Sequence, residues 1–536
     1  MTHSSVKSVL ILILFSTTTL AAPAAVDPTV IISAGTIIGT ATKPTNQPSL
    51  AASANAYLGV PFAKSPPQRF SPPEAAAPWS TPLQAQAIKP ACIQQFPGSG
   101  QSQALTKQFF NNPNGPAPEE SEDCLYLNVY TPPNATPISK KAVMFWLCGG
   151  NLQSGSGSYD YFDGSSLAIN EDVVVVTINY RTNIFGFSNS PEVSLGSQNS
   201  GFLDQRFALQ WVQQNIAAFG GDPTRVTIFG ESAGGESVKQ LLANPPSPRP
   251  FSAAILQSQN IALTGDGLAS YAQVLLNFGC IDIACLRGVN ASAIKSYIEA
   301  NSLVFPPVNN DGTFVNDVRP SIKARKFADV PTFFGTNLDE NRFLLATLGL
   351  NNGTAAVDGA LASAGITDPM VRGSIVAVYA ARGIQYGYVA AGRILTDLAF
   401  TCSTSALTMF LAMNGYTTYR YRFDASFPST SIFANSGAYH TSEIPEVFGT
   451  YPTSTQFGTV TTQQIALSAF MQKTWAGFAK NPVGGVGWPR VSGALNYLGL
   501  LGSNGSSGVS VVNNMVADYP CVVLGPIGDV MNENYR

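Results

Sequence analysis

The sequence is poor in histidine and in charge, and each shortage excludes a class of function. Its 536 residues include only two histidines, His3 and His440, and His3 lies in a segment expected to be removed. A zinc site built from several imidazoles is therefore excluded, and we expect neither a metal nor a cofactor. Only 11% of the residues are charged and the net charge is −3. Without a basic surplus, nucleic acid is not an expected partner.

Long apolar runs are also scarce, and the most apolar one lies near the N-terminus. Residues 9–15 (VLILILF) follow Lys7 and precede small residues at 21–22, which is typical of a secretory signal peptide over residues 1–22, cut within a few residues of Ala22. Seven apolar residues cannot span a bilayer, which needs about 20. We expect a secreted, extracellular protein with no transmembrane anchor, since no other apolar run approaches membrane length.

Seven cysteines and four Asn-x-Ser/Thr sequons fit an oxidising compartment. Six of the cysteines can pair and leave one free thiol, but the sequence leaves the pairing open. The candidate glycan sites are Asn134, Asn290, Asn352 and Asn504.

Strand and helix patterns alternate over much of the chain. Residues 142–147 (AVMFWL) and 173–178 (VVVVTI) are short runs typical of strands buried on both faces. Residues 204–219 carry apolar side chains at helical spacing and end at Gly220-Gly221. Further strands are predicted at 226–229, 253–256 and 330–334, and a largely helical stretch at 340–420. This order predicts an α/β fold, with a mostly parallel sheet covered by helices on both faces.

A G-x-S-x-G pattern places Ser232 between a strand and a helix. Gly230-Glu231-Ser232-Ala233-Gly234 directly follows the strand at 226–229. Such a turn lifts the serine oxygen clear of the sheet, and the helix N-terminus that follows favours developing negative charge. Ser232 is thus a candidate nucleophile, against the alternative of an ordinary turn serine. The neighbouring Glu231 either supports the site or is a packing element.

Residues 199–235 (NSGFLDQRFALQWVQQNIAAFGGDPTRVTIFGESAGG) resemble the core signature of the type-B carboxylesterase/lipase family, which includes cholinesterases and secreted fungal lipases. Three more segments agree with it: 57–62 (YLGVPF), 121–128 (SEDCLYLN) and 179–187 (NYRTNIFGF). The resemblance implies that residues 23–536 form one α/β-hydrolase domain with large loop and helical insertions.

The resemblance also supplies the acid and the base. In α/β-hydrolases the nucleophile is followed along the chain by the acid and then the histidine, and His440 is the only histidine after Ser232. By similarity to the family's Asp-Glu-Gly motif the acid is Glu340. Because Asn341 replaces the glycine of that motif, Asp339 remains an alternative. Either carboxylate would orient the imidazole and stabilise its cation.

The oxyanion-hole donors implied by the family are backbone N–H groups of Gly150, Asn151 and Ala233. Gly149, Gly150 and Asn151 follow the strand at 142–147, where the family carries three glycines. Asn151 keeps its N–H, but its side chain must find room and would restrict the acyl pocket. One such donor contributes about 3 kcal/mol in comparable sites.

The family resemblance implies one disulfide, in which Cys92 and Cys124 close a loop that serves as a lid in lipases of the family. Cys280 and Cys285 lie in one short segment and are expected to pair. Cys402 and Cys521 are then the remaining plausible pair, with Cys148 as the free thiol, although the sequence leaves that pairing open. Cholinesterases hold a quaternary ammonium on a tryptophan in that first loop. No tryptophan occurs between residues 92 and 124, so a choline ester is disfavoured. Phe305 either lines the acyl side or belongs to the core.

The predicted function is serine-dependent hydrolysis of a carboxylic ester through an acyl-enzyme. The substrate would be a small-molecule or lipid ester. We favour a broad carboxylesterase and leave open lipase or sterol-esterase activity, which would add transient contact with a lipid interface. The alternative is a catalytically inactive adhesion or binding member of the same fold. The oligomeric state stays open.

Overall fold

The computed structural model describes residue 1 and residues 27–524, apart from residues 48, 99, 114, 351–355, 364, 382, 385–386 and 494–496. The expected signal peptide over residues 1–22 and the sequon at Asn352 therefore lie outside the described residues, except for residue 1.

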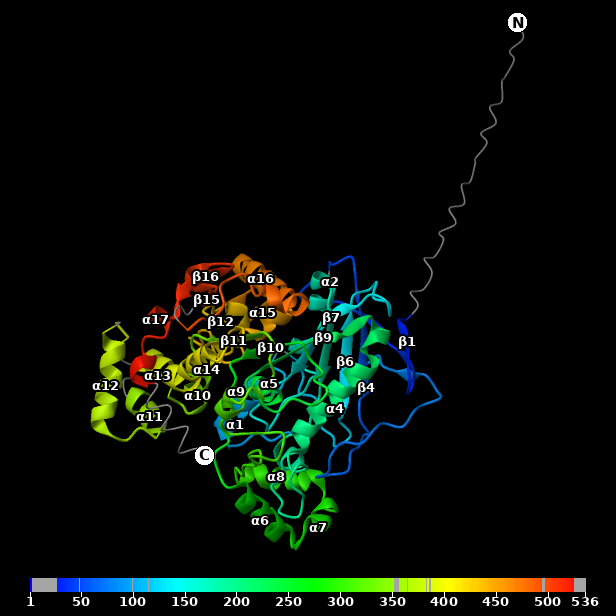
Figure 1. Cartoon of the computed structure of the whole chain (residues 1–536), viewed down its shortest axis with the longest axis horizontal. Coiled ribbons are helices and arrows are strands. Elements are labelled where there is room, and N and C mark those ends of the chain that lie inside the picture. Colours follow the sequence, from blue (N-terminus) through cyan, green and yellow to red (C-terminus); the bar gives the residue numbers. More distant parts are fainter. Residues whose placement is uncertain are drawn as a thin grey trace.

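An 11-stranded sheet forms the centre of the molecule (Figure 1). Its strands β8, β7, β9, β10, β11, β12 and β15 are parallel, and antiparallel strands flank them at both edges. In spatial order the strands are β16 (Val509–Asn513), β15 (Tyr497–Leu501), β12 (Thr418–Phe423), β11 (Thr332–Asn337), β10 (Ala253–Gln257), β9 (Gly221–Glu231), β7 (Lys141–Leu147), β8 (Val174–Ile178), β6 (Tyr126–Thr131), β4 (Ala54–Pro61) and β3 (Thr40–Thr42). Two small sheets join β1 (Thr29–Ile32), β2 (Gly35–Ile38) and β5 (Leu83–Gln84), and β13 (Ser454–Thr455) with β14 (Gly458–Thr459).

The strands have two buried faces, because successive side chains point to opposite sides of a sheet. Trp146 and Phe333 pack on one face, with the helices α2 (Ser165–Glu171), α15 (Ile444–Phe448) and α16 (Thr462–Lys480). Their neighbours Phe145 and Phe334 pack on the other, with α4 (Ser200–Asn215), α5 (Ala233–Ala243) and α14 (Cys402–Met413). The predicted mostly parallel sheet with helices on both faces is confirmed.

Individual elements agree with their sequence patterns to within a few residues. The helical pattern at 204–219 corresponds to α4 followed by a 3₁₀ turn (Ile216–Phe219), which ends at Gly220 in the left-handed conformation. The strand predicted from residue 330 begins at Thr332 instead. Pro331 has no N–H to donate, and regular pairing starts after it.

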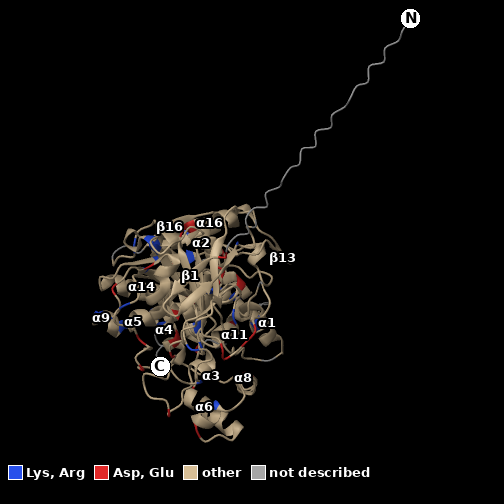
Figure 2. Ribbon diagram, turned by 90° about the vertical axis from the view of Figure 1, so that its right-hand side faces the viewer, with Lys and Arg blue, Asp and Glu red and all other residues tan. Residues whose placement is uncertain are grey.

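Helical insertions project from two sides of the sheet. The helices α6 (Gly267–Phe278), α7 (Ile283–Arg287) and α8 (Ala291–Ala300) form the lower end in Figure 1, and α11 (Ala356–Ser363) and α12 (Pro369–Ala380) lie at the left. The stretch predicted as helical also contains α10 (Arg342–Thr347) and α13 (Gly387–Thr396). The remaining helices are α1 (Gly100–Phe110), α3 (Asn183–Gly186), α9 (Arg319–Lys323) and α17 (Asn514–Ala517). Lys and Arg do not gather into one patch in the view of Figure 2.

In the part of the chain that is described, one helix meets the length and composition of a membrane span. It runs over Gly387–Met413, and 67% of its most apolar window is buried inside the protein, as in a core helix. The expectation that no second apolar stretch approaches membrane length is therefore wrong. Threonine, serine and other small residues interrupt the apolar run in the sequence, but the mean hydropathy of the helix stays in the range of a membrane span.

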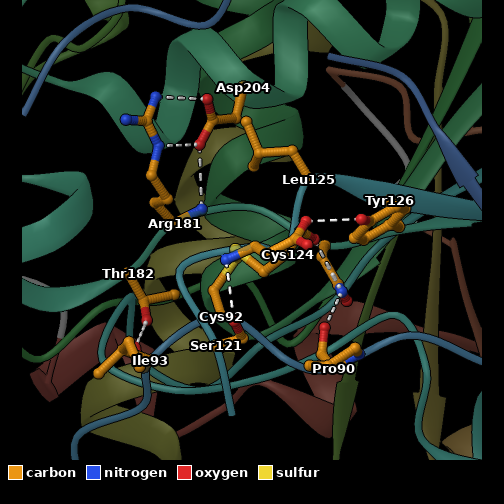
Figure 3. The surroundings of a disulfide bond; sticks show 12 residues. Pro90, Cys92, Ile93, Ser121, Cys124, Leu125, Tyr126, Arg181, Thr182 and Asp204 are labelled. Carbon is orange, nitrogen blue, oxygen red and sulfur yellow. Dashed lines mark hydrogen bonds and ion pairs between the residues drawn. A yellow bond between two sulfur atoms is a disulfide. The ribbon is translucent and has the colours of Figure 1, made fainter. Parts of the chain in front are cut away.

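The three expected disulfides are present. Cys92 pairs with Cys124, Cys280 with Cys285 and Cys402 with Cys521, while Cys148 is a buried free thiol. Beside the first disulfide, Arg181 and Asp204 form a buried bidentate ion pair with N–O distances of 2.7 and 2.8 Å (Figure 3). This pair fastens the start of α4 to the segment that follows β8.

Candidate active site

Ser232 lies at a sharp turn between β9 and α5. Its backbone is strained, with φ 58° and ψ −122°, in a region that a serine adopts only when the surrounding structure imposes it. Close packing does so here, because a Cβ on Gly234 would lie only 1.9 Å from the carbonyl oxygen of Leu147. The Ser232 N–H also donates to the carbonyl of Gln257 at 2.9 Å. The predicted strand-turn-helix context of Ser232 is confirmed.

Glu340 and His440 meet although 100 residues separate them. Nδ1 of His440 lies 2.7 Å from Oε2 of Glu340, and the His440 backbone N–H donates to the Glu340 carbonyl at 3.2 Å. The second carboxylate oxygen, Oε1, accepts from the Ser258 hydroxyl and the Asn337 N–H, both at 2.6 Å. Ser258 and Asn337 thus hold a fully buried carboxylate against the imidazole.

Asp339, the alternative acid, points elsewhere. Its Oδ1 pairs with Nη2 of Arg342 at 2.9 Å, and its Oδ2 accepts from the Ala438 N–H at 3.1 Å. Asn341, which replaces the glycine of the family motif, donates its backbone N–H to Thr396 and directly precedes α10. The structure therefore brings Glu340, and not Asp339, to His440.

Glu231 lies on the opposite edge of the imidazole. Its Oε1 is 3.2 Å from Nε2 of His440, and the Ser232 hydroxyl has no hydrogen-bond partner among the described residues. Burial raises the pKa of Glu231 well above its usual value. Burial would lower the pKa of His440, but the charge of Glu231 and the hydrogen bond and charge of Glu340 outweigh it and raise that pKa to about 9. Because their charged groups lie 3.2 Å apart, the titrations of Glu231 and His440 are coupled.

The segment that carries two of the expected oxyanion donors, Gly150 and Asn151, lies close to Ser232, and the third, Ala233, follows Ser232 in the chain. A Cβ on Gly149 would lie 2.8 Å from the Glu231 carbonyl and 2.9 Å from Cβ of Ser232, so the segment approaches the nucleophile closely. The N–H groups of Gly150, Asn151 and Ala233 donate to no described residue, which leaves them available to a bound oxyanion. Asn151 adopts a left-handed backbone conformation with φ 55°, which asparagine tolerates better than most residues.

Ser232, His440, Glu231, Gly150 and Asn151 line one cavity of about 1220 Å³. Two aromatic rings enclose the imidazole of His440: Phe343 stacks on it with ring centroids 5.5 Å apart, and Phe400 lies at 5.1 Å. Phe400 belongs to a π-helical turn, Asp397–Thr401, which joins α13 to α14. Phe96 and Phe110, from the loop between Cys92 and Cys124, line the same cavity. That loop therefore forms part of the cavity wall.

Several residues of the site could not be identified from the sequence, because only the fold brings them together. Ser258, Asn337, Phe343 and Phe400 had no motif of their own. One usable signal was the position of Ser258 and Asn337 at the ends of β10 and β11, the two strands that come next to the nucleophile strand β9 on one side, because α/β folds gather functional groups at strand ends. Phe305 is a core residue, 1% exposed, and does not line the cavity.

Sheet order, helices on both faces and a strained serine between a parallel strand and a helix define the α/β-hydrolase class. A profile described as the Carboxylesterase family matches residues 26–505. The chain therefore belongs to the carboxylesterase family, a family of carboxylic ester hydrolases.

Individual relatives agree with this membership. The chain is 32% identical to carboxylesterase 1F of Mus musculus over 83% of its own length and 86% of the relative's. It is 39% identical to an acylcarnitine hydrolase of Mus musculus, over 54% of this chain and 52% of that protein. It is also 39% identical to a cocaine esterase of Oryctolagus cuniculus, over 55% and 56%. The matched parts thus span about half the length of these last two proteins.

Proposed function

We propose that this protein hydrolyses carboxylic esters with Ser232 as nucleophile, His440 as general base and Glu340 as the carboxylate that orients His440. Ser232 Oγ attacks the ester carbonyl while Nε2 of His440 takes its proton. The imidazolium then protonates the leaving alcohol, and water hydrolyses the acyl-enzyme by the same route. The observation that carries the proposal is the 2.7 Å bond between Glu340 and His440 in the cavity into which Ser232 opens.

In this proposal Gly150, Asn151 and Ala233 stabilise the tetrahedral intermediate through their backbone N–H groups. Their position at the end of β7 and the start of α5 supports this role, because the dipole of α5 points in the same direction. Each donor would contribute about 3 kcal/mol to transition-state binding.

The substrate class follows from the cavity. Its volume of about 1220 Å³ exceeds what a short acyl group fills, since typical ligand pockets hold roughly 300–1,000 Å³. Apolar side chains from one face of the long helix line it: Leu395, Leu398, Leu407 and Phe410. We propose a broad carboxylesterase that also accepts long acyl chains, as lipases and sterol esterases do, with the loop between Cys92 and Cys124 touching a lipid interface transiently.

A chain-length series tests this proposal. Initial rates are measured on p-nitrophenyl esters from acetate to palmitate with the wild-type protein and with Ser232→Ala. We expect wild-type activity that extends to long chains and its loss in the variant. If activity ends at short chains, the long-chain part of the proposal is wrong. If both proteins are inert throughout, the inactive binding module takes the place of the enzyme.

We further propose that residues 1–22 are a signal peptide, that residues 23–536 form a single α/β-hydrolase domain and that the protein is secreted and glycosylated. Three disulfides and the exposure of Asn134, Asn290 and Asn504 support this proposal. N-terminal sequencing of the mature protein and its mass before and after peptide N-glycosidase treatment test it. A retained Met1, or an unchanged mass, would refute the corresponding part.

A further inference from the structure

The segment after β10 forms a wall of the cavity and is held by few hydrogen bonds. Residues 259–265 all line the cavity. Among the described residues, the backbone N–H groups of this segment find only two acceptors. The Asn260 N–H donates to the Ser232 carbonyl at 3.3 Å, and the Ala262 N–H donates to the side chain of Asn151 at 2.8 Å. The wall is therefore fastened to the nucleophile turn and to the proposed oxyanion segment.

Asn151 uses both ends of its carboxamide. Its Oδ1 accepts from Ala262, and its Nδ2 donates to Oε1 of Gln153 at 3.1 Å. Gln153 is itself well anchored, because its carbonyl accepts from the Gln95 N–H at 2.8 Å and from Nδ2 of Asn183 at 3.1 Å. The Asn151 side chain thus bridges a firmly held segment and a loosely held one. A glycine, which the family carries at this position, has no side chain to make this bridge.

We propose that Asn151 is a specificity-determining positioning residue: its side chain fixes the wall at residues 259–265 and so limits the size of the groups next to the scissile ester bond. The inference rests on the proposed function and extends it. Within this wall the Asn260 N–H donates to the Ser232 carbonyl, so a substituent next to the reacting carbonyl lies close to the wall. The enzyme should therefore prefer esters unbranched at the carbons flanking the ester group.

Two variants separate the parts of this proposal. Asn151→Gly removes the bridge and suits the left-handed backbone. Asn151→Asp keeps an acceptor for the Ala262 N–H but places a negative charge beside the oxyanion. Hydrogen exchange at single residues, read by mass spectrometry with electron-transfer fragmentation, should show a slow Ala262 amide in the wild type and in Asn151→Asp, and a fast one in Asn151→Gly. Equal exchange at Ala262 in all three proteins would overturn the proposal, as would a fast amide in the wild type.

Selectivity is measured on the same proteins with two pairs of esters. The ratio of kcat/KM for p-nitrophenyl pivalate over acetate reports the acyl side, and tert-butyl over ethyl acetate reports the alcohol side. We expect Asn151→Gly to raise at least one ratio by roughly 10-fold, while Asn151→Asp lowers kcat on every ester and leaves both ratios near the wild type. Unchanged ratios in Asn151→Gly would overturn the specificity role. Full activity of Ser232→Ala would instead refute the proposed function, and the Ala262 exchange rates would still decide whether the bridge exists.

Discussion

Several residues around His440 each contact a different part of its imidazole ring. Glu340 fixes Nδ1, Phe343 and Phe400 enclose the ring, and Glu231 faces Nε2. Every one of these contacts stabilises one orientation of the imidazole, and the carboxylates also favour its cation. The chemistry that we propose at Ser232 therefore depends on carboxylates that act through His440.

Replacing the two neighbouring acids tests which one orients His440. We expect Glu340→Gln to lower kcat by about 10³- to 10⁴-fold, because the amide would favour the wrong tautomer of His440. Asp339→Asn removes an ion pair with Arg342 and should lower the melting temperature with a far smaller loss of kcat. Steady-state rates on p-nitrophenyl butyrate and thermal melts check both. A larger kcat loss in Asp339→Asn would reverse the assignment.

Replacing Glu231 with Gln should shift the pH dependence of catalysis. The negative charge of Glu231 helps raise the pKa of His440 to about 9, and only neutral His440 can accept the serine proton. In the wild type, kcat/KM should therefore rise with pH as His440 loses its proton. Without that charge the pKa falls, and the rise in kcat/KM should move to lower pH by roughly 1 unit. A pH profile of kcat/KM measures this; an unmoved or upward-shifted limb would contradict it.

At the scale of elements, the buried strands could be predicted because their residues are uniformly apolar, as in β7 and β8. β12 (TYRYRF) could not, since two arginines interrupt its pattern. Its Arg420 pairs with Asp518 and its Arg422 with Asp424, so partners up to 98 residues away allow a charged strand to be buried. The same holds for the site. Ser232 could be predicted because it lies in a local sequence pattern, whereas the contacts of Ser258, Asn337 and Phe400 join distant segments and form only on folding.

The helix α1 contacts the site through a series of aromatic rings. Phe110 packs edge-on against Phe343 with ring centroids 5.2 Å apart, and Phe343 stacks on His440. We expect Phe110→Ala to lower kcat/KM by roughly 2- to 10-fold, because such a ring pair contributes about 0.5–1.5 kcal/mol beyond buried area. The exposed neighbour Gln108→Ala is the matched control and should leave kcat/KM unchanged. Equal effects of the two variants on kcat/KM would contradict a specific role for the Phe110 ring contact.

At the scale of the whole molecule, the disulfides should differ in how much they stabilise the folded protein. The bond between Cys402 and Cys521 closes a loop of 119 residues, and that between Cys280 and Cys285 one of 5. Loop-closure entropy predicts about 5 kcal/mol for the first and about 2 kcal/mol for the second. Double alanine variants, compared by guanidinium midpoint, should therefore show the larger loss for the long loop. The opposite order would contradict this account.

The composition of the whole chain argued against some classes of function but did not point to a substrate. Scarce charge and histidine argued against nucleic acid and imidazole-rich metal sites, and these stay predictions. The cavity, in contrast, is assembled from segments between residues 95 and 444. Its volume and its wall at 259–265 depend on packing between distant segments, which no local pattern encodes.

The central claim, that Ser232 is the nucleophile of an ester hydrolase, is tested most directly by covalent labelling. The protein is titrated with a serine-directed fluorophosphonate while its hydrolysis of p-nitrophenyl butyrate is followed, and the adduct is mapped by peptide mass spectrometry. We predict one adduct per chain, on Ser232, with loss of activity in proportion to labelling and no adduct in Ser232→Ala. Full activity after complete labelling of Ser232, or inactivation with the adduct at another residue, would contradict the account.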